Sequence, residues 1–445
     1  MPEAMTGAVA SISGIRGVFN DSLLSADIAG YAANFASLVQ SERILLGRDT
    51  RSTGDLISRV VTGTLLSRGV SVVDYGILST PALFRESRRS SAPALMITAS
   101  HNEPEWNGMK FVIDGRGIVH PELESILDER TSATRKEGKK RVGSTGSISL
   151  GPEPAYNGEV EHMAGAASGE GVKVVLDLNG GAAIPHAAPI LRAMGCTLTV
   201  IGGTPGVFPR RVDPTADPLE VLSRTVKEKG ADVGFAFDCD GDRLVLVDSD
   251  GRKRSGDYML TLALQELLPT VEDRSVVVSV DTTQAIDEVV SGLGGKVHRS
   301  KVGEANVISA MTEVGARFGG EGSSGGLIDR DFNSCRDSML AAVTIVRALR
   351  TRGRRVFGKV MSYNQVRLKA EIERRRAAVA IRKLQREHPE AQTLDGLKIP
   401  ISSRSWVLIR PSGTEDVVRV SAEAISEKEA AKIARTYLNA VKKLA

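Results

Sequence analysis

The stretch DVGFAFDCDGDRLVLVD, residues 232–248, consists of two apolar runs joined by a loop that contains three aspartates. Both runs are short and rich in residues that favour a buried strand. Asp238, Asp240 and Asp242 occupy alternate positions of the loop, so their carboxylates repel one another unless a cation neutralises them. Hard cations prefer oxygen ligands, and Mg²⁺ suits a site that also holds phosphate. The stretch therefore predicts a sheet with a magnesium site at its edge.

The loop DCDGDR, residues 238–243, has two alternative interpretations, a calcium loop and a solvated acidic turn. An EF-hand needs further ligands downstream and a terminal glutamate, whereas this chain returns to an apolar strand. Acidic turns are common on protein surfaces, but they rarely have an arginine at their end, here Arg243, and strands on both sides. The sequence therefore favours the metal site over both alternatives.

The order of elements before this loop occurs three times along the chain. In each copy a strand, a helix and a second strand precede a third strand that ends in a polar loop. The expected strands are 43–49, 70–76 and 94–100 in the first copy, 172–180, 196–203 and 232–238 in the second, and 275–281, 296–300 and 316–320 in the third. Such alternation is typical of mostly parallel sheets covered by helices. We expect three similar α/β domains with mostly parallel mixed sheets.

The C-terminal part of the chain follows a different pattern. The basic segment 366–388 is interpreted as a helix, residues 406–424 as two strands around a tight loop, and Glu427–Leu444 as a final helix. This pattern predicts a smaller α+β domain. The expected domains are 1–148, 149–252, 253–362 and 363–445.

Three polar loops follow the three third strands: TASHNEPEWNGMK (98–110), DCDGDR (238–243) and GGEGSSGG (319–326). In open α/β sheets, ligands bind outside the carboxyl ends of the strands. Three equivalent strand ends therefore predict one shared central cleft, to which the fourth domain adds RPSGTED (410–416).

Ser100 lies at the end of a predicted strand, beside His101. The sequence has neither a Ser-His-Asp order nor a G-x-S-x-G elbow, so it does not favour a hydrolase. A serine that faces a bound divalent ion can carry a phosphate, whose charge of about −1.5 to −2 the aspartates would repel without the metal. The alternative is a turn serine that caps a helix, and the acidic loop makes this alternative the weaker one.

Cationic side chains near the polar loops are candidates for contacts with phosphate. Lys110 could act as a base if metal and cationic neighbours lower its pKa, although an exposed lysine is the alternative. Arg16, Arg48 and Arg51 are further candidates for contacts with phosphate.

The segment RPSGTED has the composition of a phosphate-binding loop. Arg410 offers a two-pronged donor, Ser412 and Thr414 offer hydroxyls, and Gly413 lets backbone amides approach an anion. A β-turn is the alternative. Glu321 in GGEGSSGG is a candidate acceptor for sugar hydroxyls, or else part of a flexible turn.

The composition excludes several functional classes. Hydrophobic residues make up 41% and charged residues 25%, as in ordinary globular proteins, and the low aromatic content of 4% argues against binding of single-stranded nucleic acid. No apolar run is long enough to span a bilayer, and the N-terminus does not resemble a signal peptide. Cys196, Cys239 and Cys335 form no C-x-x-C pair, which indicates a reducing compartment. We expect a cytoplasmic protein that binds neither nucleic acid nor membranes.

Seven motifs, in this order and over nearly the whole chain, resemble those of the α-D-phosphohexomutase family, which includes phosphoglucosamine mutase, phosphomannomutase and phosphoglucomutase. They are SGIRG (13–17), GRDTR (47–51), TASHN (98–102), DCDGDR (238–243), GGEGSSGG (319–326), CRDSMLAA (335–342) and RPSGTE (410–415). The loop GGEGSSGG is more similar to the archaeal form of its motif than to the bacterial one. Cys239, Glu103, Trp106 and Asp416 depart from the usual residues, which leaves the choice of sugar open.

The resemblance implies four domains around a deep cleft and a role for each motif. Ser100 would carry the phosphate, and the three aspartates would bind Mg²⁺ together with a phosphoserine oxygen. Lys110 and His101 would lie beside the reacting oxygen, with Lys110 as the expected proton acceptor, and Arg16 and Arg243 would act in the cleft. The substrate-binding residues would be Glu321, Ser323 or Ser324, Arg410, Ser412, Gly413 and Thr414.

The resemblance further implies interconversion of hexose 6-phosphates and hexose 1-phosphates through a phosphoserine enzyme, with a hexose bisphosphate as intermediate and activator. SGIRG and Glu304 favour phosphoglucosamine mutase, with phosphomannomutase/phosphoglucomutase as the alternative. A metal-dependent phosphatase and an inactive sugar-phosphate-binding regulator are more remote alternatives. The expected partners are hexose phosphates, and the expected assembly is a monomer or a homodimer.

Overall fold

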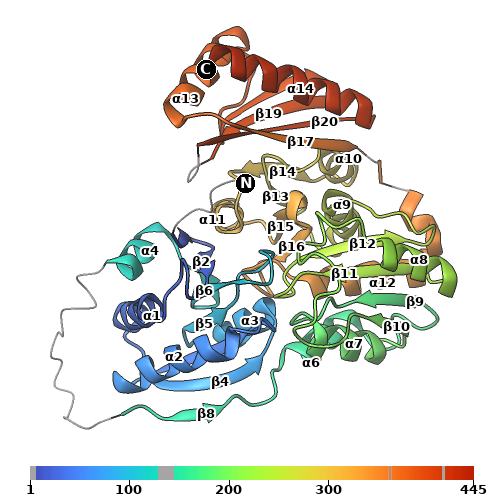
Figure 1. The fold of residues 1–445 in the computed structure, drawn as a ribbon. Helices are drawn as coiled ribbons and strands as arrows, with labels where there is room; N and C mark the ends of the chain where they lie inside the picture. The colour runs from blue at the N-terminus through green and yellow to red at the C-terminus, as the bar shows by residue number, and fades with distance from the viewer. Residues whose placement is uncertain (1–6, 129–144, 359, 362, 413–415) are drawn as a thin grey trace.

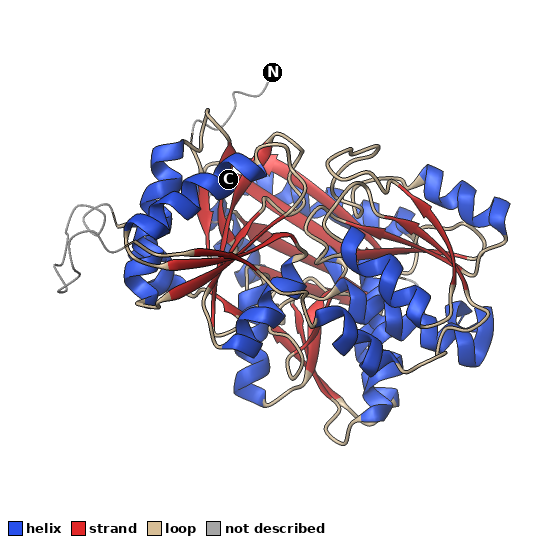
Figure 2. Cartoon of the chain, turned by 90° about the horizontal axis from the view of Figure 1, so that it is seen from below, coloured by secondary structure: helices blue, strands red, loops and turns tan. Residues whose placement is uncertain are grey.

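The computed structural model describes residues 7–128, 145–358, 360–361, 363–412 and 416–445. The strands of these residues form four separate sheets, and helices lie against each of them (Figure 1 and Figure 2). No helix in these ranges is long and apolar enough to cross a membrane.

The first sheet has eight strands in the order β1-β2-β6-β5-β3-β4-β8, with β7 paired to β6. Its strands are β1 (Val9–Ser11), β2 (Gly14–Val18), β3 (Arg43–Arg48), β4 (Ser71–Ile77), β5 (Ala94–Ile97), β6 (Trp106–Ile113), β7 (Arg116–Gly117) and β8 (Ile148–Leu150). The helices of this part are α1 (Ser25–Val39), α2 (Gly54–Ser67), α3 (Thr80–Ser90) and α4 (His120–Leu127).

The second and third sheets have four strands each. The second contains β9 (Lys173–Asp177), β10 (Thr197–Ile201), β11 (Val233–Phe237) and β12 (Leu244–Asp248), and the third β13 (Ser275–Ser279), β14 (Lys296–Ser300), β15 (Phe318–Glu321) and β16 (Gly326–Asp329). The helices here are α6 (Tyr156–Ala164), α7 (Ile184–Ala193), α8 (Glu220–Lys229), α9 (Gly256–Leu267), α10 (Ala285–Gly292), α11 (Glu304–Val314) and α12 (Ser338–Arg352). Three short 3₁₀ helices are also present: η1 (Leu268–Thr270), η2 (Gly322–Ser324) and η3 (Gly353–Gly358).

The first three sheets share one strand order. The neighbours are β4-β3-β5-β6, β10-β9-β11-β12 and β14-β13-β15-β16, and in each set the first three strands are parallel and the last is antiparallel. Each polar loop joins the third strand of its set to this antiparallel fourth strand. The prediction of three similar α/β domains is therefore confirmed, whereas the domain boundaries taken from the sequence stay predictions.

The fourth sheet is wholly antiparallel and has the order β17-β20-β19-β18. Its elements are β17 (Asn364–Glu371), α13 (Arg374–Glu387), β18 (Leu397–Ser402), β19 (Ser405–Pro411), β20 (Val417–Ala424) and α14 (Glu427–Leu444). The smaller α+β domain is confirmed. The prediction of a helix over 366–388 is wrong for its first part, because Val366, Leu368 and Ala370 alternate with charged residues as in a strand, and Val366 and Leu368 pack against the core of this domain.

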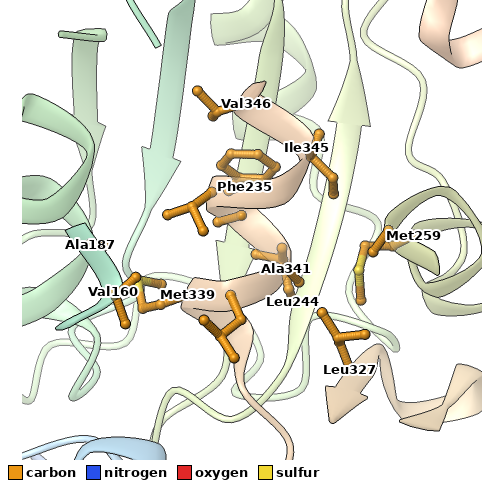
Figure 3. Packing of buried hydrophobic residues seen from close by; sticks show 14 of the residues in the cluster. Val160, Ala187, Phe235, Leu244, Met259, Leu327, Met339, Ala341, Ile345 and Val346 are labelled. Carbon is orange, nitrogen blue, oxygen red and sulfur yellow. The ribbon is translucent and has the colours of Figure 1, made fainter. Parts of the chain in front are cut away.

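Helix α12 lies in the middle of the hydrophobic core that joins the first three domains (Figure 3). Asp337 caps its first turn by accepting hydrogen bonds from the backbone amides of Met339 and Leu340. The helix then contacts α6 and α7 on one side and α9 and β16 on the other. The buried side chains of Ile345 and Val346 therefore connect the second domain to the third.

The fourth domain is docked on the third through polar contacts around an apolar centre. Glu423, which is fully buried, accepts hydrogen bonds from the backbone amide of Gln284 (3.0 Å) and from Trp406 Nε1 (2.8 Å). Lys398 Nζ donates to the Val280 carbonyl at 2.7 Å and lies 4.1 Å from the centre of the Trp406 ring. The backbone of the third domain is thus held by side chains of the fourth.

Truncation of the central helix should weaken the folded state. Ile345→Ala removes buried methyl groups and leaves a cavity, so we expect the free energy of unfolding to fall by about 2–5 kcal/mol. Ile148→Ala, at a position that is 55% exposed, is the matched control and should change stability by less than about 0.5 kcal/mol. Denaturant titrations of both variants test this, and equal losses would contradict the central role of α12.

A second prediction concerns Asp257, a buried residue of α9 near the junction with the fourth domain. Its carboxylate accepts a hydrogen bond from the Thr283 backbone amide at 2.8 Å and lies 3.7 Å from the Arg367 guanidinium. Burial raises the pKa of Asp257 to about 7, against the opposing effect of Arg367. Because an unfolded aspartate has a pKa of about 3.9, the folded chain binds this proton more tightly, and stability falls as pH rises from about 4 to about 7.

Asp257→Asn should therefore gain stability relative to the parent protein as pH rises through this window. The difference in melting temperature, variant minus parent, should increase between about pH 4 and about pH 7 and then level off. Asp250→Asn, at an exposed position of the preceding turn, is the control. A difference that stays constant over the window would show that Asp257 does not titrate there.

Candidate active site

Ser100 is fully buried and has a left-handed backbone conformation, with φ of +51°. A residue with a side chain rarely adopts this conformation unless its surroundings enforce it. Here the Ser100 amide donates to Thr98 Oγ1 at 2.8 Å, and the Thr98 hydroxyl donates to Asp49 at 2.6 Å. The end of β5 thus fixes the direction of the serine.

Arg51 holds the rest of the serine loop. Its Nη1 donates to the carbonyls of Glu103 and Trp106, its Nη2 donates to those of Ser100 and Asn102, and its Nε donates to Asp49. All five N–H donors of this buried guanidinium are therefore used within the first domain. The interpretation of Arg51 as a phosphate contact is wrong, because it is an anchor of the loop.

The three aspartates of DCDGDR meet Ser100. The Ser100 hydroxyl lies 3.5 Å from Asp238 Oδ2, and one oxygen from each aspartate lies within 4.8 Å of the others. Gly241 makes the tight turn possible through a positive φ of +69°. The prediction that the serine and the acidic loop come together is borne out by this geometry.

The charges of this cluster indicate a place for a cation. Asp240 Oδ1 and Asp242 Oδ1 are buried and have no hydrogen-bond partner among the described residues. Burial, together with Asp242 and Asp240, raises the pKa of Asp238 well above its usual value. Arg243 Nε lies 3.9 Å from Asp242 Oδ1 without a hydrogen bond. Carboxylate oxygens that lack hydrogen bonds at this spacing are the ligands that hard divalent cations prefer, so these residues fit Mg²⁺.

Lys110 projects from β6 into the same cluster. Its Nζ lies 2.6 Å from Asp240 and 3.1 Å from Asp242. Burial by itself would lower the pKa of Lys110, but the two carboxylates outweigh burial and raise it. The raised pKa reflects the pairing with two aspartates, which the sequence did not reveal, and the lowered pKa expected beside a bound metal stays a prediction.

His101 and two arginines lie next to the serine. Arg243 Nη2 is 2.8 Å from His101 Nδ1, and since an arginine can only donate, this nitrogen accepts and the proton of the neutral ring is assigned to Nε2. Burial, Arg243 and Arg16 lower the pKa of His101 to about 2. Arg16 donates to the Asn102 side chain at 3.0 Å, and burial lowers its pKa to about 10. His101 is therefore neutral at physiological pH.

The sugar loop, residues 319–326, is tied to the metal loop by a residue that the sequence did not single out. Arg336 donates to Asp242 at 2.8 Å and to Glu321 and the Ser324 hydroxyl, both at 3.2 Å. Glu321 also accepts a hydrogen bond from the Gly303 backbone amide at 2.7 Å. The neighbouring residue Ser323 is half-buried. The available signal was the matched motif CRDSMLAA, which places an arginine directly before a buried helix.

The phosphate loop of the fourth domain is described only in part. The Arg410 guanidinium lies 3.5 Å from the Asp395 carboxylate. Asp395 also accepts a hydrogen bond at 3.0 Å from the backbone amide of Val302, in the third domain. Ser412 is buried, and its amide donates to the Val417 carbonyl. Gly413 and Thr414 lie outside the described residues. The convergence of the first three loops is thus seen directly, and the cleft itself stays a prediction.

The chain matches models for all four domains of one protein family. These are phosphoglucomutase/phosphomannomutase α/β/α domain I at residues 10–137, domain II at 155–251, domain III at 255–363 and the C-terminal domain at 365–440. The matches follow the same order as the four sheets.

Curated relatives and a solved structure agree with these matches. A probable phosphoglucosamine mutase of Methanopyrus kandleri is 33% identical, with 97% of each chain covered, and a phosphoglucomutase/phosphomannomutase of Thermococcus kodakarensis is 31% identical, with 96% of this chain and 95% of the relative covered. A crystal structure of a phosphoglucomutase/phosphomannomutase family protein from Burkholderia thailandensis superposes with a TM-score of 0.84, at 25% identity and 98% coverage of both chains. The chain therefore belongs to the phosphoglucomutase/phosphomannomutase family, the α-D-phosphohexomutases.

Proposed function

We propose that this phosphohexomutase interconverts glucosamine 6-phosphate and glucosamine 1-phosphate through a phosphoserine at Ser100. The observation that carries the proposal is the contact of 3.5 Å between the Ser100 hydroxyl and Asp238, inside a cluster with unpaired carboxylate oxygens. The name of the relative from Methanopyrus kandleri supports glucosamine phosphate as the substrate.

Each half of the reaction exchanges a phosphoryl group for a proton. A sugar hydroxyl attacks the phosphorus of phosphoserine, the bond from phosphorus to Ser100 Oγ breaks, and overall the hydroxyl proton passes to Oγ. The resulting hexose bisphosphate reorients in the site, and its other phosphate is transferred to Ser100. A bisphosphate can therefore also activate the dephosphorylated enzyme by phosphorylating Ser100. The ligands of Mg²⁺ would be Asp238, Asp240, Asp242 and a phosphoserine oxygen, and the ion supplies positive charge for the phosphoryl oxygens.

The cations of the site would then stabilise charge and position groups. Lys110 contacts Asp240 and Asp242, so we assign its ammonium group to stabilisation of the transferring phosphoryl group. Its role as the proton acceptor stays a prediction. Arg16 and Arg243 add positive charge on the serine side. His101, whose Nδ1 accepts from Arg243, would present its Nε2 proton to a phosphoryl oxygen.

The sugar and its second phosphate need contacts that serve both orientations of the substrate. Glu321 would accept sugar hydroxyls, and of the two neighbouring serines we favour Ser323, because the Ser324 hydroxyl already donates to the Glu321 carbonyl and accepts from Arg336. The non-reacting phosphate would be held by the fourth-domain loop, Arg410, Ser412, Gly413 and Thr414.

A second candidate function is the interconversion of mannose or glucose phosphates. The name of the relative from Thermococcus kodakarensis favours it, at 31% identity.

The cytoplasmic location and a monomeric or homodimeric assembly stay predictions.

Specificity constants will distinguish the two candidates. With Mg²⁺ and trace hexose 1,6-bisphosphate, we expect kcat/KM to be highest for glucosamine 6-phosphate among the 6-phosphates of glucosamine, mannose and glucose. The reason is that the single positive charge of Arg336 is shared by Glu304, Glu321 and Asp242, so the carboxylates beside the sugar loop are in excess and can attract an ammonium group. A higher value for mannose or glucose 6-phosphate would select the second candidate, and stoichiometric release of inorganic phosphate would indicate a phosphatase.

Replacement of the serine should abolish turnover without unfolding the protein. Ser100→Ala removes the group that accepts the phosphate, so we expect kcat on all three substrates to fall by at least about 10³-fold, with loss of covalent phosphate from the intact protein by mass spectrometry. Ser403→Ala, at an exposed position between β18 and β19, is the matched control. Wild-type turnover in Ser100→Ala would refute the phosphoserine mechanism.

A further inference from the structure

Arg336 is a buried cation that contacts loops of two domains. It directly precedes Asp337, the cap of α12, so the helix in the centre of the core fixes its backbone. Its Nη2 donates to Asp242 Oδ2 at 2.8 Å, and its Nη1 donates to Glu321 Oε2 at 3.2 Å. One guanidinium thus connects the metal loop of the second domain with the sugar loop of the third.

The contact with Asp242 decides which of its oxygens is free. Arg336 and Lys110 both contact Oδ2, whereas Oδ1 is buried, has no hydrogen-bond partner among the described residues and lies 3.9 Å from Arg243 Nε. The carboxylate is therefore oriented with one oxygen already paired and the other available as a ligand.

Further contacts hold the arginine itself. Its backbone amide donates to Glu304 Oε2 at 2.9 Å, and its Nη1 also donates to the Ser324 hydroxyl. Its Nε lies 3.1 Å from the same Glu304 oxygen as an ion pair without a hydrogen bond. Because the guanidinium is planar and its donors point in fixed directions, these contacts leave it little freedom to rotate. A lysine at this position would keep the charge but could not make the same set of contacts.

We propose that Arg336 is a positioning residue for the metal site: it holds Asp242 with Oδ1 free for the cation and makes that orientation depend on the sugar loop. The metal part of this proposal stands on the described contacts alone, and the link to sugar binding rests on the proposed function. Residues that orient metal ligands typically change metal affinity by 10–100-fold when they are replaced.

The test is a direct measurement of metal binding, without substrate or turnover. The probe is Mn²⁺, followed by electron paramagnetic resonance or calorimetry on the full chain, with Mg²⁺ as competitor. We expect Arg336→Lys to raise the dissociation constant by about tenfold or more, because the charge remains while the planar set of contacts that orients Asp242 is lost. Failure of the proposed mutase reaction would leave this result unaffected.

The matched control is Arg317→Lys. Arg317 also makes a two-pronged pair with a carboxylate of the third domain, Asp329, but it does not contact the metal loop. Its replacement should leave the dissociation constant within about twofold of the parent value, as measured on proteins with comparable melting temperatures. An Arg336→Lys protein that binds Mn²⁺ as tightly as the control would overturn the proposal.

A second variant keeps the proposal testable if Arg336→Lys does not fold. Glu304→Gln weakens the contacts that hold the arginine and leaves Asp242 and Arg336 in place. We expect a smaller increase in the Mn²⁺ dissociation constant, in the same direction. An unchanged or lower constant in this folded variant would equally count against a positioning role.

Discussion

The structure of this protein depends on the balance of charge around three buried aspartates. Carboxylates that are fully buried and lie within 4.8 Å of one another can stay ionised only if cations surround them. Each of the first three domains supplies one: Lys110 comes from the first, Arg243 from the second and Arg336 from the third. The domains are therefore held together at the same place where the chemistry is proposed to occur.

The repeated strand order explains why these groups meet. In every copy, the loop that follows the third strand is closed by an antiparallel fourth strand, so both ends of the loop are fixed by a sheet. Helix α12 packs between the second and third domains, and Arg336 directly precedes its cap, Asp337. The position of the arginine is thus set by apolar packing, which is insensitive to the charge of the site.

Much of this architecture could be predicted from the sequence, because strand patterns and loop motifs are local. The final helix, Glu427–Leu444, was predicted with its observed bounds, and Ser100 was correctly expected to meet the acidic loop. The errors concern long-range contacts or competing patterns. Lys110 pairs with aspartates 130 and 132 positions away, and Arg336 contacts Asp242 across 94 positions, so local patterns could not reveal these contacts. In β17, the alternation of apolar residues outweighs the basic composition that suggested a helix.

The left-handed backbone of Ser100 has a consequence for what else could occupy this position. A β-branched side chain is strongly disfavoured at a positive φ, because its second substituent on Cβ approaches the backbone. Threonine carries the same hydroxyl as serine, yet it would have to adopt this conformation or displace the loop that Arg51 holds at four carbonyls. The shape of the main chain, and not only the chemistry of the hydroxyl, therefore restricts the residue types that evolution can place here.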